Sequence, residues 1–514
     1  MKLQFKFASL LPALLFVLAD ILYLYYDASV ISSPDQIIRI LLLFLVGLIF
    51  ILYLIYRAVK NWHMAGLLLL VLSTAIFSSS MIFKNTMIIL AGAIAVYYIL
   101  YKVGKQPNSL KQLMRVMNVA GVLFLFIALI NLWAQAFYLP FLNIPQFTWD
   151  DRLLDAQLYP PEVKPDIYYI VLDGYGREDI LREYYGYDNS GFIKELQNRG
   201  FIVPENSLSN YPKTALSIAS TLNMDYISNL VPELSDNDTT YWWLMKPLIQ
   251  DSNARRLLEE GGYQSYAATT GWGITDIPSA DVYYQPDPVV VNDFESFVLS
   301  VSPIGVLTKL LSKFSYIPSY EDHRDLILYN FEVVSDITHR QGAKFIFVHI
   351  VAPHPPFVFN ASGDSVTPDY PYSFNDANDI QLNDSEYRDG YVAQLEFINE
   401  KIKTLIDDIL SNSVVPPIII LQADHGPGML VDFRSADLTC LRERFSIFAA
   451  YYLPGVDPND FPEDITPVNT FRIVFNEYFN TAYPLQMNKH YYQRNELNLY
   501  STEDVTSSVS TCTR

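Results

Sequence analysis

The feature that most constrains the fold is a series of apolar runs in the first 139 residues. An α-helix crosses a bilayer with about 20 mostly apolar residues. Five runs approach or reach this length: Phe7–Tyr26, Ile37–Tyr56, Met64–Phe83, Met87–Tyr101 and Val116–Leu139. Such lengths disfavour buried helices of a soluble domain, and the first run lacks the cleavage site of a signal peptide. We therefore predict a transmembrane domain of five helices over residues 1–139.

Basic residues between the runs predict the orientation of this domain. Cytoplasmic loops carry more Lys and Arg than external loops. Only Arg39 and Lys84 fall on one side of the predicted helices, whereas the other side carries Lys2, Lys6, Arg57, Lys60, Lys102, Lys105, Lys111 and Arg115. We therefore expect a multi-pass protein of the cell membrane. Its N-terminus is cytoplasmic, and everything after Leu139 lies outside the cytoplasm.

Charge is divided unevenly along the chain. The 514 residues carry a net charge of −20, yet residues 1–149 hold ten Lys and Arg against three acidic residues. The remainder holds 25 basic and 52 acidic residues, a net charge of −27. So acidic a domain is expected to be soluble and not to bind nucleic acid. An anionic substrate must then be held by local cations.

After the apolar runs the sequence pattern changes first to a proline-containing segment and then to alternating strands and helices. Residues 140–165 contain five prolines and predict a juxtamembrane linker. Beyond it, apolar strands alternate with helical stretches, which is typical of an α/β domain with a largely parallel sheet covered on both faces. The predicted strands are 167–172, 201–203, 263–268, 345–351, 418–423 and 444–452, and the predicted helices are 192–199, 214–224, 253–260, 323–340, 385–410 and 467–479. We assign this domain to residues 166–480 and expect a C-terminal tail over 481–514, loose from residue 501 onward.

The two cysteines, Cys440 and Cys512, leave two alternatives open. Outside the cytoplasm they could form a disulfide, whereas the position of Cys512 in a polar tail equally suits two unpaired thiols. Their spacing excludes a metal site built from thiolates.

Acidic residues follow two of the predicted strands. Asp173 comes directly after 167–172, and Asp424-His425 comes directly after 418–423, with a glycine following each motif. Each acid alone could be a turn residue or a helix cap. Together, at the ends of two buried strands, carboxylates and an imidazole suit a divalent cation. The sequence therefore predicts a metal site at this edge of the sheet.

Two further residues could carry chemistry. Thr214 opens the predicted helix 214–224, where it could be only an N-cap, a role that threonine fills well. A hydroxyl at a helix N-terminus also meets free N–H groups that favour phosphate, and a metal would lower its pKa further. His354 follows the predicted strand 345–351 and could bind a substrate oxyanion or protonate a leaving group. His349, inside the same apolar strand, is predicted to be a buried core histidine.

Four motifs in order carry a family resemblance: VLDGYG (171–176), NYPKTALSIASTL (210–222), HIVAPHPPF (349–357) and LQADHG (421–426). The chain resembles the alkaline phosphatase/sulfatase superfamily, and most closely its membrane-anchored branch of phosphoglycerol and phosphoethanolamine transferases similar to lipoteichoic acid synthase. The resemblance covers roughly residues 165–480 and the membrane architecture.

The resemblance implies an alkaline-phosphatase-like α/β core with one divalent metal ion (Mn, Mg or Zn). It implies Thr214 as nucleophile and His354 as the substrate-binding histidine. It further implies Asp173, Thr214, Asp424 and His425 as metal ligands. The implied enzyme moves a phospholipid headgroup from a membrane donor, through a phospho-threonine intermediate, to a glycan, a lipid or water.

One departure from the family pattern, at the position of the nucleophile, bears on the alternative functions. Sulfatases of this superfamily require a cysteine or serine in a CxPxR-type motif, yet here the position reads Thr214-Ala-Leu-Ser-Ile218. The first alternative, a hydrolase of sulfate or phosphate monoesters, is therefore disfavoured for sulfate. The second alternative is a catalytically inactive envelope protein. It predicts a broken nucleophile or metal set, whereas all these residues are present.

Overall fold

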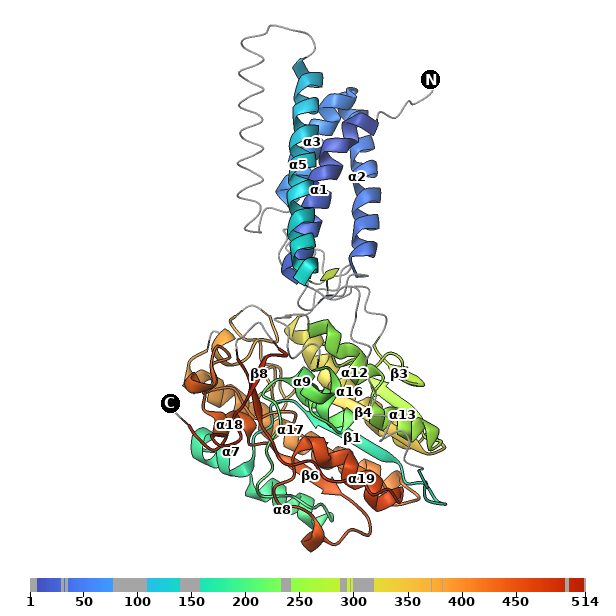
Figure 1. The fold of residues 1–514 in the computed structure, drawn as a ribbon, viewed down its shortest axis with the longest axis vertical. Helices are drawn as coiled ribbons and strands as arrows, with labels where there is room; N and C mark the ends of the chain where they lie inside the picture. Colours follow the sequence, from blue (N-terminus) through green and yellow to red (C-terminus); the bar gives the residue numbers. More distant parts are fainter. Residues whose placement is uncertain are drawn as a thin grey trace. The chain divides into compact units, whose positions relative to one another are not determined.

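The structure is a computed structural model, shown in Figure 1. It describes residues 7–28, 32, 36–76, 109–138, 158–232, 242–286, 294–295, 297–298, 319–370, 372–380, 382–494 and 499–512. Two compact units make up the chain. Unit 1 contains Met1–Ile144 and Val289–Ile317, and unit 2 contains Pro145–Pro288 and Pro318–Arg514. Each unit is described below by itself.

Unit 1 is helical in the residues that the structure describes. Its helices are α1 (Phe7–Ala28), α2 (Ile37–Val59), α3 (Trp62–Ile76) and α5 (Ser109–Tyr138). Three of them, α1, α2 and α5, contain segments long and apolar enough to span a membrane. The prediction of five spans is thus supported for three. The run Met87–Tyr101 lies outside the described residues.

A short segment distant in sequence completes the core of unit 1. Phe294 and Val298 are fully buried among the apolar side chains of the helices. The Phe294 ring packs edge-on against Tyr25, with centroids 5.5 Å apart. Glu295 forms an ion pair with Arg39 at the start of α2. No pattern near residue 295 predicted that this segment packs with the N-terminal helices.

A six-stranded sheet organises unit 2. Its strands are β1 (Ile167–Leu172), β2 (Gln264–Ala268), β3 (Val282–Tyr284), β4 (Lys344–Ile350), β5 (Ile418–Gln422) and β6 (Ala449–Tyr452), in the order β3-β2-β4-β1-β5-β6. Only β6 runs antiparallel to its neighbour. All residues of β1, β4 and β5 are buried, which explains why these strands are mostly apolar in sequence. The predicted α/β domain with a largely parallel sheet is confirmed.

Helices cover both faces of this sheet (Figure 1). Among the described residues the α-helices of unit 2 are α7 (Glu178–Tyr185), α8 (Ser190–Asn198), α9 (Thr214–Asn223), α10 (Ile227–Leu230), α12 (Lys246–Gln250), α13 (Asn253–Glu260), α16 (Tyr320–Thr338), α17 (Asp384–Asn412), α18 (Leu441–Phe445) and α19 (Thr470–Tyr478). Along β1 the side chains alternate between faces. Tyr168 and Ile170 pack with α16 and α17, whereas Tyr169 packs against Phe471 of α19. The core therefore lies in two layers around a central β1.

Three local predictions need correction. The predicted strand 201–203 makes only an isolated bridge, from Ile202 to Tyr451. The predicted strand 444–452 begins as helix α18 and becomes a strand only at Ala449. The expected loose tail is ordered through Cys512. Strands β7 (Tyr491–Gln493) and β8 (Thr502–Asp504) pair with each other, and Cys512 is bonded to Cys440.

This disulfide is expected to stabilise unit 2. It closes a separation of 72 residues, and a loop of this length stabilises a fold by about 2–4 kcal/mol. Replacing both cysteines by serine should lower the free energy of unfolding by that amount, measured as a lower Tm of the full chain in detergent. Reductant should lower the Tm of the wild type and leave the variant unchanged. Equal Tm values for both proteins without reductant would contradict the prediction.

Candidate metal centre

The predicted site residues meet where three neighbouring strands end. Strand β1 lies between β4 and β5 and runs parallel to both. Asp173 follows β1, His354 follows β4, and Asp424 follows β5. Backbone groups join these ends, since the His354 N–H donates to the Asp173 carbonyl at 3.1 Å. The Gly174 N–H donates to Asp424 Oδ1, also at 3.1 Å.

Thr214 reaches the same place from helix α9. Its side chain is buried, and its Oγ1 lies 3.1 Å from His425 Nε2. The Ser217 hydroxyl, one turn further on, donates to the Asp424 carbonyl at 2.7 Å and ties α9 to the loop after β5. Lys213 occupies the N-cap position. The alternative that Thr214 is only an N-cap is therefore wrong.

The hydrogen bonds of His425 indicate which nitrogen carries its proton. Nδ1 lies 3.0 Å from the Gly426 carbonyl, an acceptor, so Nδ1 is the protonated nitrogen and the Thr214 hydroxyl donates to Nε2. Burial lowers the pKa of His425, and the neighbouring Arg444 lowers it further. A neutral imidazole with its Nε2 lone pair directed into the site is the form that binds metals.

Two carboxylate oxygens beside this lone pair have no hydrogen-bond partner among the described residues. Both Asp173 Oδ1 and Asp424 Oδ2 are buried and unsatisfied. They lie 3.6 and 3.2 Å from His425 Nε2. Buried acceptors that face one another are costly unless a cation lies between them. Oxygen and imidazole donors of this kind suit Zn²⁺ or Mn²⁺, so these residues fit a divalent cation.

His349 belongs to the site as well. It is fully buried, as predicted for a core histidine, yet its Nε2 donates to Asp173 Oδ2 at 3.0 Å, and the Thr275 hydroxyl donates to its Nδ1 at 3.0 Å. Asp173, His349 and Asp424 each offer a ligand atom within 4.8 Å of the others. A hydrogen bond to one carboxylate oxygen orients the other oxygen toward a metal. The position of His349 could have predicted this role, because it is the next-to-last residue of β4, the strand beside β1.

The charge of Asp173 is favoured by these histidines. Burial by itself raises the pKa of Asp173, but His354 and the hydrogen bond from His349 outweigh it and hold the pKa well below its ordinary value. The carboxylate is therefore ionised and ready to bind a cation at neutral pH.

Two buried residues beside the site were not predicted. The guanidinium of Arg444, in α18, lies 3.2 Å from His425 Nε2 and donates to Asp376 Oδ2 at 2.7 Å. The same Asp376 oxygen lies 3.8 Å from His354 Nε2. Asp376 comes from a polar loop and Arg444 from a short charged stretch, so neither position carries a sequence signal for a site.

Glu443, next to Arg444, predicts a pH dependence of stability. Burial raises the pKa of this fully buried carboxyl from 4.5 to about 8. Because the folded pKa lies above the unfolded one, its contribution to stability is complete below pH 4.5 and is lost as the pH rises toward 8. Glu443→Gln should therefore raise the Tm relative to wild type increasingly between pH 5 and about 8. A difference in Tm that stays constant over this range would contradict the assignment.

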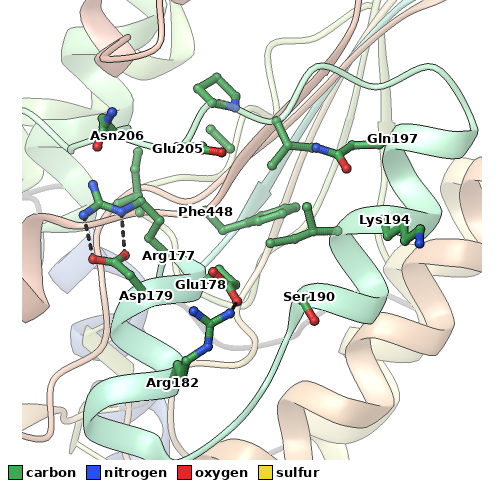
Figure 2. A pocket seen from close by; sticks show the side chains of 15 residues that line it. Arg177, Glu178, Asp179, Arg182, Ser190, Lys194, Gln197, Glu205, Asn206 and Phe448 are labelled. Carbon is green, nitrogen blue, oxygen red and sulfur yellow. Dashed lines mark hydrogen bonds and ion pairs between the residues drawn. The ribbon is translucent and has the colours of Figure 1, made fainter.

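A separate pocket of about 630 Å³ lies between α7, α8 and β6 (Figure 2). Its floor is apolar and includes Phe448, and its rim carries both charges, with Arg177 paired to Asp179 at 2.7 Å. None of its lining residues belongs to the metal centre. The pocket and the metal centre are therefore two distinct sites.

The sequence matches the family model named Sulfatase over residues 165–509. The chain belongs to the Sulfatase family, which confirms the predicted alkaline phosphatase/sulfatase superfamily. No curated protein matches the sequence.

Several solved structures are similar to the chain at low identity. The C-terminal periplasmic domain of EcEptC from Escherichia coli, in complex with Zn, is 11% identical over 68% of this chain and 96% of its own, with a TM-score of 0.43. The integral membrane lipooligosaccharide phosphoethanolamine transferase EptA from Neisseria meningitidis is 11% identical over 82% of this chain and 70% of its own, with a TM-score of 0.38. A putative sulfatase from Bacteroides thetaiotaomicron is 15% identical over 63% of this chain and 72% of its own, with a TM-score of 0.36. The family assignment rests on the sequence match alone.

Proposed function

We propose that the protein is a membrane-bound, metal-dependent phosphotransferase or phosphodiesterase. It moves a phospholipid headgroup of the phosphoglycerol or phosphoethanolamine type through a phospho-threonine intermediate. Membership of the Sulfatase family supports ester chemistry at this site. The donor is a membrane phospholipid, and the acceptor is a glycan, a lipid or water.

One observation carries this proposal. The Thr214 hydroxyl lies 3.1 Å from His425 Nε2, at the first residue of a helix and beside two buried carboxylate oxygens without partners. This combination provides a nucleophile, an adjacent nitrogen acceptor and a set of cation ligands. The same position would need cysteine or serine for the sulfatase route, which disfavours sulfate as substrate.

The reaction follows from these positions. The Thr214 hydroxyl loses its proton to solvent, its oxygen attacks the headgroup phosphorus, the bond from phosphorus to the diacylglycerol oxygen breaks, and His354 protonates that leaving oxygen. The acceptor hydroxyl then gives its proton to His354 and attacks the phosphorus, the bond from phosphorus to the Thr214 oxygen breaks, and Thr214 takes up a proton from solvent. A divalent cation held by Asp173, Thr214, Asp424 and His425 would lower the pKa of the Thr214 hydroxyl and offset charge on the phosphoryl oxygens.

The site is proposed to face outward from the cell membrane. Three helices long and apolar enough to cross a membrane support anchoring. The Cys440–Cys512 disulfide in unit 2 supports an oxidising environment, since such bonds are rare in the cytoplasm. The basic loops between the apolar runs favour a cytoplasmic N-terminus.

The test measures release of diacylglycerol by the full chain in detergent with Mn²⁺ or Zn²⁺. Phosphatidylethanolamine, phosphatidylglycerol, p-nitrophenyl phosphate and p-nitrophenyl sulfate are offered separately. We expect metal-dependent release from at least one phospholipid and no sulfate release. Turnover of only the monoesters would favour the hydrolase alternative, and no turnover of any substrate by folded, metal-bound protein would favour the inactive envelope protein.

A further inference from the structure

We propose that the buried Asp376–Arg444 ion pair is a positioning device for the Thr214 and His425 half of the metal centre. This inference rests on the proposed function in that it takes Thr214 and His425 as the residues that react and bind metal. It assigns roles to two residues that neither the sequence motifs nor the family match singles out.

The contacts of Arg444 support this role. Its side chain is 2% exposed, so its charge is held inside the fold. Nε donates to the Pro212 carbonyl at 2.9 Å, in the loop that leads into α9. Nη1 donates to the Gly426 carbonyl at 3.0 Å, next to His425 in the chain, and Nη2 lies 3.2 Å from His425 Nε2. One planar guanidinium thus links the segment before the nucleophile to the segment that carries the metal-binding histidine.

Asp376 holds this guanidinium in place. The carboxylate is 5% exposed and accepts from Arg444 Nη1 at 2.7 Å through Oδ2 and from the Tyr387 hydroxyl at 2.6 Å through Oδ1. A buried arginine without a carboxylate partner is strongly unfavourable, so loss of Asp376 releases Arg444 from its position. Because Asp376 Oδ2 also lies 3.8 Å from His354 Nε2, the same carboxylate faces the third functional side chain.

Gly428 provides the space for this carboxylate. A Cβ at this residue would lie 2.4 and 2.5 Å from the two oxygens of Asp376. The Gly428 N–H also donates to the Tyr387 hydroxyl at 3.0 Å. The Asp376 carboxylate, from the loop before α17, occupies the space that a side chain at residue 428 would need, which explains the glycine at this position.

The effect of the pair on the site follows from geometry. The Thr214–His425 distance of 3.1 Å depends on two chain segments that are joined directly by the hydrogen bond from Ser217 to the Asp424 carbonyl and bridged by Arg444 through the Pro212 and Gly426 carbonyls. Residues that orient metal ligands change metal affinity or activity by about 10–100-fold when they are replaced. A displacement of about 1 Å at a reacting group costs about 10²-fold in rate.

The test compares Asp376→Asn and Gly428→Ala with Asp432→Asn in the full chain in detergent. Asp432 is the control, because it is also a buried carboxylate of unit 2 paired with an arginine, although the side chain of that arginine, Arg434, is 62% exposed. Calorimetry measures the Kd for Mn²⁺ without substrate, and turnover gives kcat and KM. We expect the Mn²⁺ Kd to rise about 10–100-fold in the first two variants and to stay within about threefold of wild type in Asp432→Asn. Where the wild type turns over, kcat should fall about 10²-fold with KM little changed.

The outcomes separate this proposal from the proposed function. Wild-type Mn²⁺ affinity in folded Asp376→Asn and Gly428→Ala, even with a lower Tm, would overturn the positioning role. Weakened Mn²⁺ binding in both variants would support it even if no phospholipid is turned over, in which case only the proposed function fails. If Asp376→Asn does not fold, Gly428→Ala decides alone, since it keeps the charge and only displaces the carboxylate.

Discussion

Thr214→Ala should lower turnover by at least about 10³-fold, because loss of a covalent nucleophile removes the main reaction path. Little of the fold depends on this side chain. Its described hydrogen bond goes to His425, and α9 remains tied to the Asp424 loop through Ser217. Metal binding should weaken but persist, since Asp173, Asp424 and His425 are retained. The measurement is kcat/KM for the preferred phospholipid, together with Tm.

Two variants control this result. Thr214→Ser keeps a hydroxyl at the start of α9 and should retain far more activity than the alanine variant. Thr221→Ala removes a buried hydroxyl from the same helix, one that donates to the Ser217 carbonyl at 2.7 Å. It should lower stability by about 1 kcal/mol without a comparable loss of turnover. If Thr214→Ala kept a tenth or more of the activity, Thr214 would not be the nucleophile.

Asp424→Asn should abolish the response of the protein to metal. Asp424 Oδ2 is buried without a partner, whereas Oδ1 accepts from the Gly174 N–H, a bond that an asparagine oxygen can keep. Removing one of two facing charges should raise the Tm of the metal-free protein. Saturating metal, at about 100 times its Kd, stabilises a protein by about 2.7 kcal/mol. The variant should lose this stabilisation, together with at least about 10²-fold in metal affinity.

The decisive comparison is Tm with and without Mn²⁺. Asp389→Asn serves as the control, because that carboxylate is 74% exposed on α17 and should leave both Tm values unchanged. A metal-induced rise in Tm that survives in Asp424→Asn would exclude Asp424 as a ligand. A lower metal-free Tm in Asp424→Asn would show that its charge stabilises the fold without a cation.

Much of unit 2 could be predicted because its strands are buried on both faces. Mostly apolar runs predicted β1, β4 and β5 nearly to the residue, and the helix 253–260 was predicted with the bounds of α13. The motifs at the ends of those strands therefore lie close together, since parallel strands end at one edge of a sheet. The position of Asp173, His354 and Asp424 at one edge follows from the strand order.

Residues brought in by irregular segments could not be predicted. Asp376 and Arg444 come from a loop and a five-residue helix, whose approach to the site depends on tertiary packing rather than on local periodicity. The same holds for Phe294, which packs in unit 1 although it follows three strands of unit 2. The disulfide between Cys440 and Cys512 joins the tail to unit 2, and the sequence alone left this pairing open.

The central claim, a phospho-threonine at Thr214, is tested most directly by intact-mass spectrometry. The full chain in detergent is incubated with Mn²⁺ and a mixture of phosphatidylethanolamine and phosphatidylglycerol, with Thr214→Ala treated in parallel. We predict a metal-dependent adduct on the wild type, mapped to the peptide containing Thr214, whose added mass identifies the headgroup, and none on the variant. An adduct that persists in Thr214→Ala, or no adduct on folded, metal-bound wild type that turns over phospholipid, would contradict this account.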